Sequence, residues 1–283
     1  MSVILISDSA CDMTQAEAKE LGVTVLPLKI QIDGVEYLDG VTITTEEFYE
    51  KLDSCEKLPT TSQLSPAEFM DVLQPAADRG DEAVIITLAG KLSGTAQSAA
   101  IAAAETDGKV WVVDSGSATF GQCILLRYAI RLRSQGLSGG EIARELERVK
   151  SRVRLVARVD TLEYLMRGGR LSRGAAFAGT LLHIKPVISV ENGEIKVLGK
   201  ARGSRQSDNM LTEFIQKSGG VDFSMPVMLG FSGTDDALLK GYIENSRALW
   251  EGHIDELQVC MIGSTISTHA GPGAIGAAFF SAE

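Results

Sequence analysis

Short apolar runs alternate with amphipathic segments along the first half of the chain. Runs typical of buried strands lie at 3–6, 84–88 and 110–113, and an alternating strand pattern covers 23–32. Helices are expected between them, at 14–21, 45–52, 66–79, from about 95, 118–134 and 140–152. Ser65, Pro66 and Glu68 mark one start as an N-cap, a first-turn proline and a capping-box acid. This rhythm predicts an α/β fold whose mostly parallel sheet has helices on both faces.

The second half has a different rhythm, with a clear hairpin around Asn192-Gly193. Strands are expected at 156–160, 186–190, 195–198, 227–231 and 257–262. Helices are expected at 162–167, from there to about His183, at 204–217, at 235–250 and shortly after 274. A hairpin together with crossover helices predicts a mixed sheet. We therefore expect two α/β domains, residues 1–157 with a small hairpin insertion near 23–58, and residues 158–283.

Composition narrows the class of protein. The 283 residues have 27 basic and 37 acidic side chains and a formal net charge of −10, which argues against broad binding to nucleic acid or anionic membrane. The apolar runs are too short for a membrane span, and the first residues lack a signal-peptide pattern, so we expect a cytoplasmic protein without stable membrane insertion. Four scattered cysteines predict neither a disulfide framework nor a metal site.

Polar clusters follow three of the expected strands. They are Ser7-Asp8-Ser9, Ser93-Gly94-Thr95 and Asp114-Ser115, and Asp12 lies close behind the first. The carboxyl ends of parallel strands meet at one edge of a sheet, where ligands commonly bind, so we expect these clusters to gather there. Ser93-Gly94-Thr95 also opens a helix, which makes it a candidate receptor for a small anion. The alternative is a plain helix N-cap, because the segment matches neither a Walker loop nor a nucleophile elbow.

Two further loops carry hydrogen-bonding side chains. Thr60, Thr61, Ser62 and Gln63 follow a proline and could donate several hydrogen bonds to one oxyanion, or form a polar loop and nothing more. His269 is expected in a Gly/Pro-rich turn, where it could face a cleft and donate to a carboxylate, or simply bond nearby backbone.

Two basic groups stand out in an acidic chain. One surrounds Arg170, together with Arg167 and Arg173, and the other surrounds Arg202, together with Lys200 and Arg205. Arginine suits contact with carboxylate or phosphate, although solvated surface charge explains either group equally well.

The combination of motifs resembles the DegV family of bacterial fatty-acid-binding proteins, the FakB type, over the whole chain. The motifs are Asp8-Ser9 with Asp12, Pro59 to Gln63, Leu92 to Thr95 with Gln97-Ser98-Ala99, Val113 to Ser115, Thr161 to Leu165 with Gly168-Gly169-Arg170, Ile184-Lys185-Pro186, and Thr268-His269 with Gly271 to Ala274. Each alone is weak, but their order and spacing together are specific.

The resemblance implies two α/β domains with a long-chain fatty acid buried between or within them. It implies a carboxylate held by the Thr60-Thr61 hydroxyls, the Ser93-Gly94-Thr95 segment and His269, with Arg170 and Ser62 near the head group. The implied partner is a separate ATP-dependent fatty acid kinase that forms an acyl-phosphate, with Arg202 at its docking surface. The protein itself would be a carrier without catalytic residues, metal or cofactor.

Two other functions stay open at this point. A serine hydrolase or acyl transferase would use Ser93, His269 and an acid such as Asp114. A non-catalytic sensor of a small lipid or anion would need no kinase. The preference for acyl length and saturation, the oligomeric state, the identity of the kinase and the fate of the acyl-phosphate are not predictable from this sequence.

Overall fold

The computed structural model describes residues 2–171 and 184–282. Its first sheet is parallel throughout, in the order β2-β1-β6-β7. The strands are β1 (Val3–Asp8), β2 (Val23–Leu26), β6 (Glu82–Thr87) and β7 (Lys109–Asp114). The flanking helices are α1 (Gln15–Glu20), α3 (Pro66–Asp78), α4 (Thr95–Glu105), α5 (Thr119–Ser134) and α6 (Gly139–Val149).

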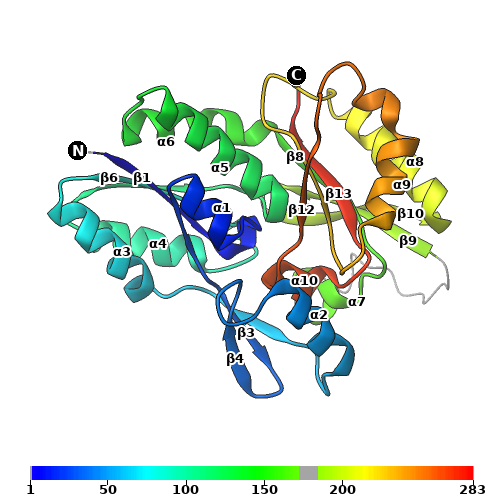
Figure 1. Cartoon of the computed structure of the whole chain (residues 1–283), viewed down its shortest axis with the longest axis horizontal. Helices are drawn as coiled ribbons and strands as arrows, with labels where there is room; N and C mark the ends of the chain where they lie inside the picture. The colour runs from blue at the N-terminus through cyan, green and yellow to red at the C-terminus, as the bar shows by residue number, and fades with distance from the viewer. Residues whose placement is uncertain (1, 172–183, 283) are drawn as a thin grey trace.

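Alternate residues of the central strands enter two different cores. Leu5 and Val84 pack with α5 and α6, whereas Ile6 and Ile85 pack with α3 and α4, and Figure 1 shows these helix pairs on opposite faces of the sheet. A strand that is buried on both faces has apolar residues at consecutive positions, and this pattern predicted the central strands.

A small antiparallel sheet, in the order β4-β3-β5, stands beside the first one. It contains β3 (Lys29–Ile32), β4 (Val35–Leu38) and β5 (Thr60–Ser62), with α2 (Thr45–Ser54) alongside. The single strand expected over 23–32 is wrong: it divides into β2 and β3, in different sheets, around Pro27, which has no N–H to donate to a ladder. Thr60, Thr61 and Ser62 likewise form a strand against β3 and not a loop.

The second sheet is mixed, in the order β10-β9-β8-β13-β11-β12, as expected. Its strands are β8 (Val153–Arg158), β9 (Ile184–Glu191), β10 (Glu194–Arg202), β11 (Met228–Phe231), β12 (Gln258–Met261) and β13 (Ile275–Phe280). Its helices are α7 (Glu163–Arg167), α8 (Gly203–Lys217), α9 (Ala237–Asn245) and α10 (Ser264–Ala270). Short 3-10 turns cover Ser9–Cys11, Lys150–Arg152 and Arg247–Leu249.

Three helices expected in the second half are absent, shorter or outside the described residues. The helix expected after 274 is wrong, because that apolar run is β13, a strand paired on both sides and buried along its length. The helix expected over 235–250 ends earlier, at Asn245, and a 3-10 turn follows. The helix expected to reach His183 falls outside the described residues, and so does Arg173. The second sheet takes its first strand from 153, four residues before the expected domain boundary.

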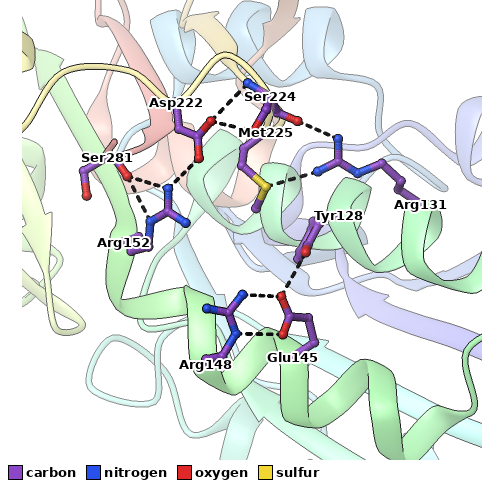
Figure 2. Close-up of polar contacts among 9 residues, drawn as sticks. All are labelled: Tyr128, Arg131, Glu145, Arg148, Arg152, Asp222, Ser224, Met225 and Ser281. Atoms are coloured by element: carbon purple, nitrogen blue, oxygen red, sulfur yellow. Dashed lines mark hydrogen bonds and ion pairs between the residues drawn. The ribbon is translucent and has the colours of Figure 1, made fainter. Parts of the chain in front are cut away.

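Helix α5 joins the two sheets. The Phe120 ring of α5 packs directly against Gly230 on β11 and Gly276 on β13. A Cβ at Gly230 would lie 2.4 Å from the ring and a Cβ at Gly276 would lie 2.9 Å from it, so the two glycines leave the space that the ring occupies. Figure 2 shows the polar side of this junction, where Arg131 of α5 donates to the Ser224 carbonyl at 2.7 Å and Arg152 pairs with Asp222 at 2.5 Å. None of the helices in the described part of the chain is long and apolar enough to cross a membrane.

Candidate functional site

An apolar cavity lies where the carboxyl ends of the parallel strands face the second sheet. It encloses about 920 Å³ of space free of protein atoms, its open mouth included, and we call it the central cavity. Leu155 and Ala157 of β8, Val159 just after it, and Ile188 and Val190 of β9 line one wall. Side chains from the first half complete it, among them Leu28, Leu88, Leu92 and Phe120. Apolar side chains from both halves of the chain therefore build the wall of the central cavity.

Nine polar residues line the central cavity, and six of them form what we call its polar end: Thr61, Ser62, Gln63, Ser93, Arg170 and His269. Thr119, Ser189 and Thr265 also line the cavity. The six residues of the polar end come from β5, from the loop between β6 and α4, from the segment after α7 and from α10. Four segments remote in sequence therefore bring hydroxyl, amide, guanidinium and imidazole groups to one place.

His269 lies in the last turn of α10, so its expected position in an irregular turn is wrong. Gly271, in a left-handed conformation, ends the helix just behind it. Its Nε2 atom lies 2.8 Å from the Thr61 hydroxyl oxygen. Nδ1 is buried and has no hydrogen-bond partner among the described residues. Gly168 packs against this side of the ring, since a Cβ there would lie 2.2 Å from Nδ1.

The charge state of His269 follows from its surroundings. Burial, and to a lesser degree the nearby Arg170 guanidinium, lower the pKa of His269 to about 4. The imidazole is therefore neutral at pH 7, with one nitrogen donating and the other accepting. A carboxylate brought beside it would favour the charged form and raise that pKa again.

Arg170 supplies the positive charge of the polar end. Its Nε donates to the Leu92 carbonyl at 3.2 Å and its Nη1 donates to the Gly168 carbonyl at 2.7 Å. No carboxylate of the described residues forms an ion pair with it. Burial lowers the pKa of Arg170, yet an arginine stays protonated in proteins. The cation is thus oriented by backbone carbonyls, and no acid of residues 2–171 and 184–282 pairs with it.

Ser93 reaches the central cavity, whereas Gly94 and Thr95 do not line it. The Ser93 hydroxyl lies 2.9 Å from the Thr95 hydroxyl, and Thr95 N donates to it at 3.3 Å. Thr95 is fully buried, and Gly94 is the N-cap of α4. A Cβ at Gly94 would lie 2.0 Å from the Gln63 side-chain oxygen, so the glycine allows Gln63 to cross over this loop. Of the two threonines expected to bind, Thr61 lines the cavity and Thr60 is exposed outside it.

Buried carboxylates hold α10 in place from behind. Asp12 accepts from Gly263 N at 3.0 Å, and Asp39 accepts from Thr265 N at 3.3 Å and from the Ser9 hydroxyl at 2.9 Å. Burial raises the pKa of both carboxyls. No local sequence pattern marked Asp39 as part of this arrangement, because its partner Thr265 lies more than 200 residues away and its partner Ser9 lies in another loop.

Asp8 and Asp114 meet the expectation that the strand ends gather. Asp8 accepts from Leu88 N at 2.9 Å, and Asp114 accepts from Gly90 N at 3.1 Å and from Gly116 N at 2.8 Å. Both acids therefore stabilise the loops behind the cavity wall, and neither bonds His269. The Ser93 hydroxyl is likewise bonded to Thr95 and the imidazole to Thr61, so the arrangement needed by a serine hydrolase is not assembled.

The remaining candidates lie away from the cavity. Arg202 is exposed at the end of β10, where its backbone N donates to the Gln206 side chain at 2.8 Å. The four cysteines are free thiols. Within residues 2–171 and 184–282, no group of three or more His, Cys, Asp or Glu side chains is placed to hold a metal ion.

Comparisons with known proteins agree over the full chain. The family model described as "Uncharacterised protein, DegV family" matches residues 2–282. A DegV domain-containing protein of Caldanaerobacter subterraneus subsp. tengcongensis is 37% identical over 278 residues, 98% of each chain.

Solved structures give the same result. A DegV family protein from Thermus thermophilus, described by its fatty acid binding, is 33% identical, with a TM-score of 0.88 over 99% of this chain and 100% of that one. The Streptococcus pneumoniae Fatty Acid Kinase B3 protein, loaded with linoleic acid, is 22% identical and shows the same fold, with a TM-score of 0.85 over 99% of each chain. The chain belongs to the DegV family.

Proposed function

We propose that this protein binds a long-chain fatty acid in the central cavity and presents its carboxylate to a separate ATP-dependent fatty acid kinase. The kinase would transfer phosphate to the carboxylate and form an acyl-phosphate, and this chain would act as the carrier. One observation carries the proposal: a largely apolar cavity has a polar end that contains Thr61, Ser93, Arg170 and His269. The Thermus relative, described by its fatty acid binding, supports the ligand class.

The energetics fit an amphiphile with one charged end. Each buried methylene contributes about 0.8 kcal/mol, so a long acyl chain gains several kcal/mol in an apolar cavity. A carboxylate buried without partners would cost more than this gain returns. The Arg170 cation, which no acid of the described residues neutralises, offsets that cost, and the hydroxyls of Thr61 and Ser93 can donate hydrogen bonds.

The polar end is also close to the surface. Ser62 and Gln63 line the cavity and are exposed, and Thr60 is exposed beside them. A carboxylate held at Thr61 and Ser93 would therefore stay open to a second protein. The kinase part of the proposal rests on this access and on the resemblance to the FakB type.

Native lipid content tests the ligand directly. We expect near-stoichiometric long-chain fatty acid in organic extracts of the purified protein, identified by mass spectrometry. Delipidated protein should take fatty acid up again when it is added. A protein that is empty on purification and takes up no added fatty acid would overturn the proposal.

The kinase partnership makes a separate prediction. Replacing Arg202 with alanine should weaken kinase binding and lower acyl-phosphate formation about tenfold, because a charge at the rim of an interface guides association, while fatty acid content stays unchanged. Arg144→Ala is the matched control, since Arg144 is an exposed arginine on α6. Equal turnover in the Arg202 variant and the control would remove Arg202 from the docking surface.

A further inference from the structure

The central cavity has a polar end and an opposite end, and the opposite end lies against the β9–β10 hairpin. Val159 packs with Leu165 and Leu171 in the small core beside the Arg170 segment. Leu155, four residues earlier on β8, belongs instead to the large core that contains Phe120. Four residues of extended chain span about 13 Å. The wall formed by β8 and the residue after it therefore runs from the polar end at Val159 to Leu155.

Val190 closes this opposite end. It pairs with Leu155 on one side and with Ile195 on the other, so three apolar side chains meet at one level of the sheet. All three line the central cavity, and Val190 is 8% exposed. Beyond this level the hairpin turns back at Asn192 and Gly193.

A second, polar pocket begins directly behind Val190. It is lined by the Ser115–Ser117 loop, by Lys150 and Arg154, and by Glu191 and Asn192. We call it the outer pocket. Val190 is the one residue that lines both the central cavity and the outer pocket among the described residues. Val190 thus lies between an apolar interior and a polar, open space.

The backbone that carries Val190 is fixed on its outer side. Gly193 N donates to the Gly116 carbonyl at 2.9 Å, and a Cβ at Gly193 would lie 3.3 Å from the Ala89 side chain. The Lys91–Glu194 ion pair beside it is more than half exposed and contributes little. Because the turn is held against the first half of the protein, the size of side chain 190 determines where the cavity ends.

We propose that Val190 sets the longest acyl chain that the central cavity accepts, by separating it from the outer pocket. This inference rests on the proposed binding of a fatty acid. A chain that fits would end against Leu155, Val190 and Ile195. A longer one would have to displace Val190 and push its terminal methyl group into polar surroundings.

Chain-length profiles of three proteins test the inference. Delipidated wild type, Val190→Ala and Val187→Ala are titrated with saturated fatty acids from lauric to behenic acid, and dissociation constants are measured by competition with a fluorescent fatty acid. We expect Val190→Ala to move the preference toward longer acids, with affinity rising about fourfold for each methylene newly accommodated. Val187 is the matched control, a buried valine on the same strand whose side chain packs in the other core.

Each outcome decides the question. A longer preference in Val190→Ala alone supports the inference, and the same profile in all three proteins overturns it. If Val190→Ala does not fold, Val190→Leu tests the same inference with a larger side chain. A preference for shorter acids in Val190→Leu supports the inference, and an unchanged preference overturns it. A wild type that binds no acid of any length overturns the proposed function, and with it the role of Val190.

Discussion

The Gly168→Ala variant is expected to bind fatty acid about 10-fold to 100-fold more weakly than the wild type, although the substitution adds one methyl group. A Cβ at Gly168 would lie 2.2 Å from His269 Nδ1 and 3.0 Å from His269 Cε1. The ring would have to leave its place beside Thr61. A hydrogen bond to a charged group contributes about 1.5–3 kcal/mol, which corresponds to that loss. The backbone itself accepts alanine, because Gly168 has φ −72° and ψ −7°.

A double-mutant cycle separates this effect from a general loss of stability. His269→Ala alone should weaken binding by a similar factor, and Gly168→Ala should cost little more once the ring is gone. Gly241→Ala is the control, since nothing lies within 4 Å of a Cβ at this exposed position of α9. Additive losses in the double variant would show that Gly168 acts independently of His269.

Gly168 also illustrates what the sequence could not show. Its neighbour Arg170 and its partner His269 were candidates because arginine and histidine have chemistry that can be read residue by residue. The need for glycine comes from a close approach between α7 and α10, about 100 residues apart. Local patterns contain no signal for such a contact.

Local signals predicted most element starts and the tight turns. Ser65 caps α3 as expected, and both residues of the expected Asn192-Gly193 turn have positive φ. These features depend on neighbours within a few residues, so the sequence contains the whole cause.

The failures share a different cause. The run that forms β13 is apolar on both faces, and periodicity alone does not distinguish a buried strand from a buried helix. Thr60 to Ser62 became a strand only because β3 offers an edge. The central cavity likewise depends on contacts between segments that are distant in the sequence. The resemblance to a known family, and not the spacing of residues, indicated that Thr61, Ser93 and His269 belong to one site.

Arg158→Met is expected to lower the free energy of unfolding by about 3–5 kcal/mol at pH 8, the usual cost of leaving one partner of a buried pair alone. Arg158 is 2% exposed and lies on β8, on the face opposite the central cavity. Its Nη1 lies 3.3 Å from Asp208 Oδ1 on α8. Burial lowers the pKa of Arg158 and raises the pKa of Asp208, so each charge depends on the other.

Urea denaturation at two pH values and a second substitution make the test specific. In Arg158→Met the folded protein holds Asp208 with a pKa further above that of the unfolded chain, so it binds more protons and its stability falls as pH rises through that raised pKa. The deficit should therefore be smaller at pH 5 than at pH 8. Adding Asp208→Leu should restore most of the loss, because a well-packed apolar pair replaces a buried ion pair at little cost.

The exposed Lys217–Glu213 pair at the other end of α8 provides the control, and Lys217→Met should change stability by less than about 0.5 kcal/mol. Since α8 begins directly after Arg202, the buried pair also fixes the helix next to the proposed docking surface. An Arg158→Met protein as stable as the wild type at pH 8 would mean that apolar packing alone, through Leu211 and Ile215, holds α8 against the sheet.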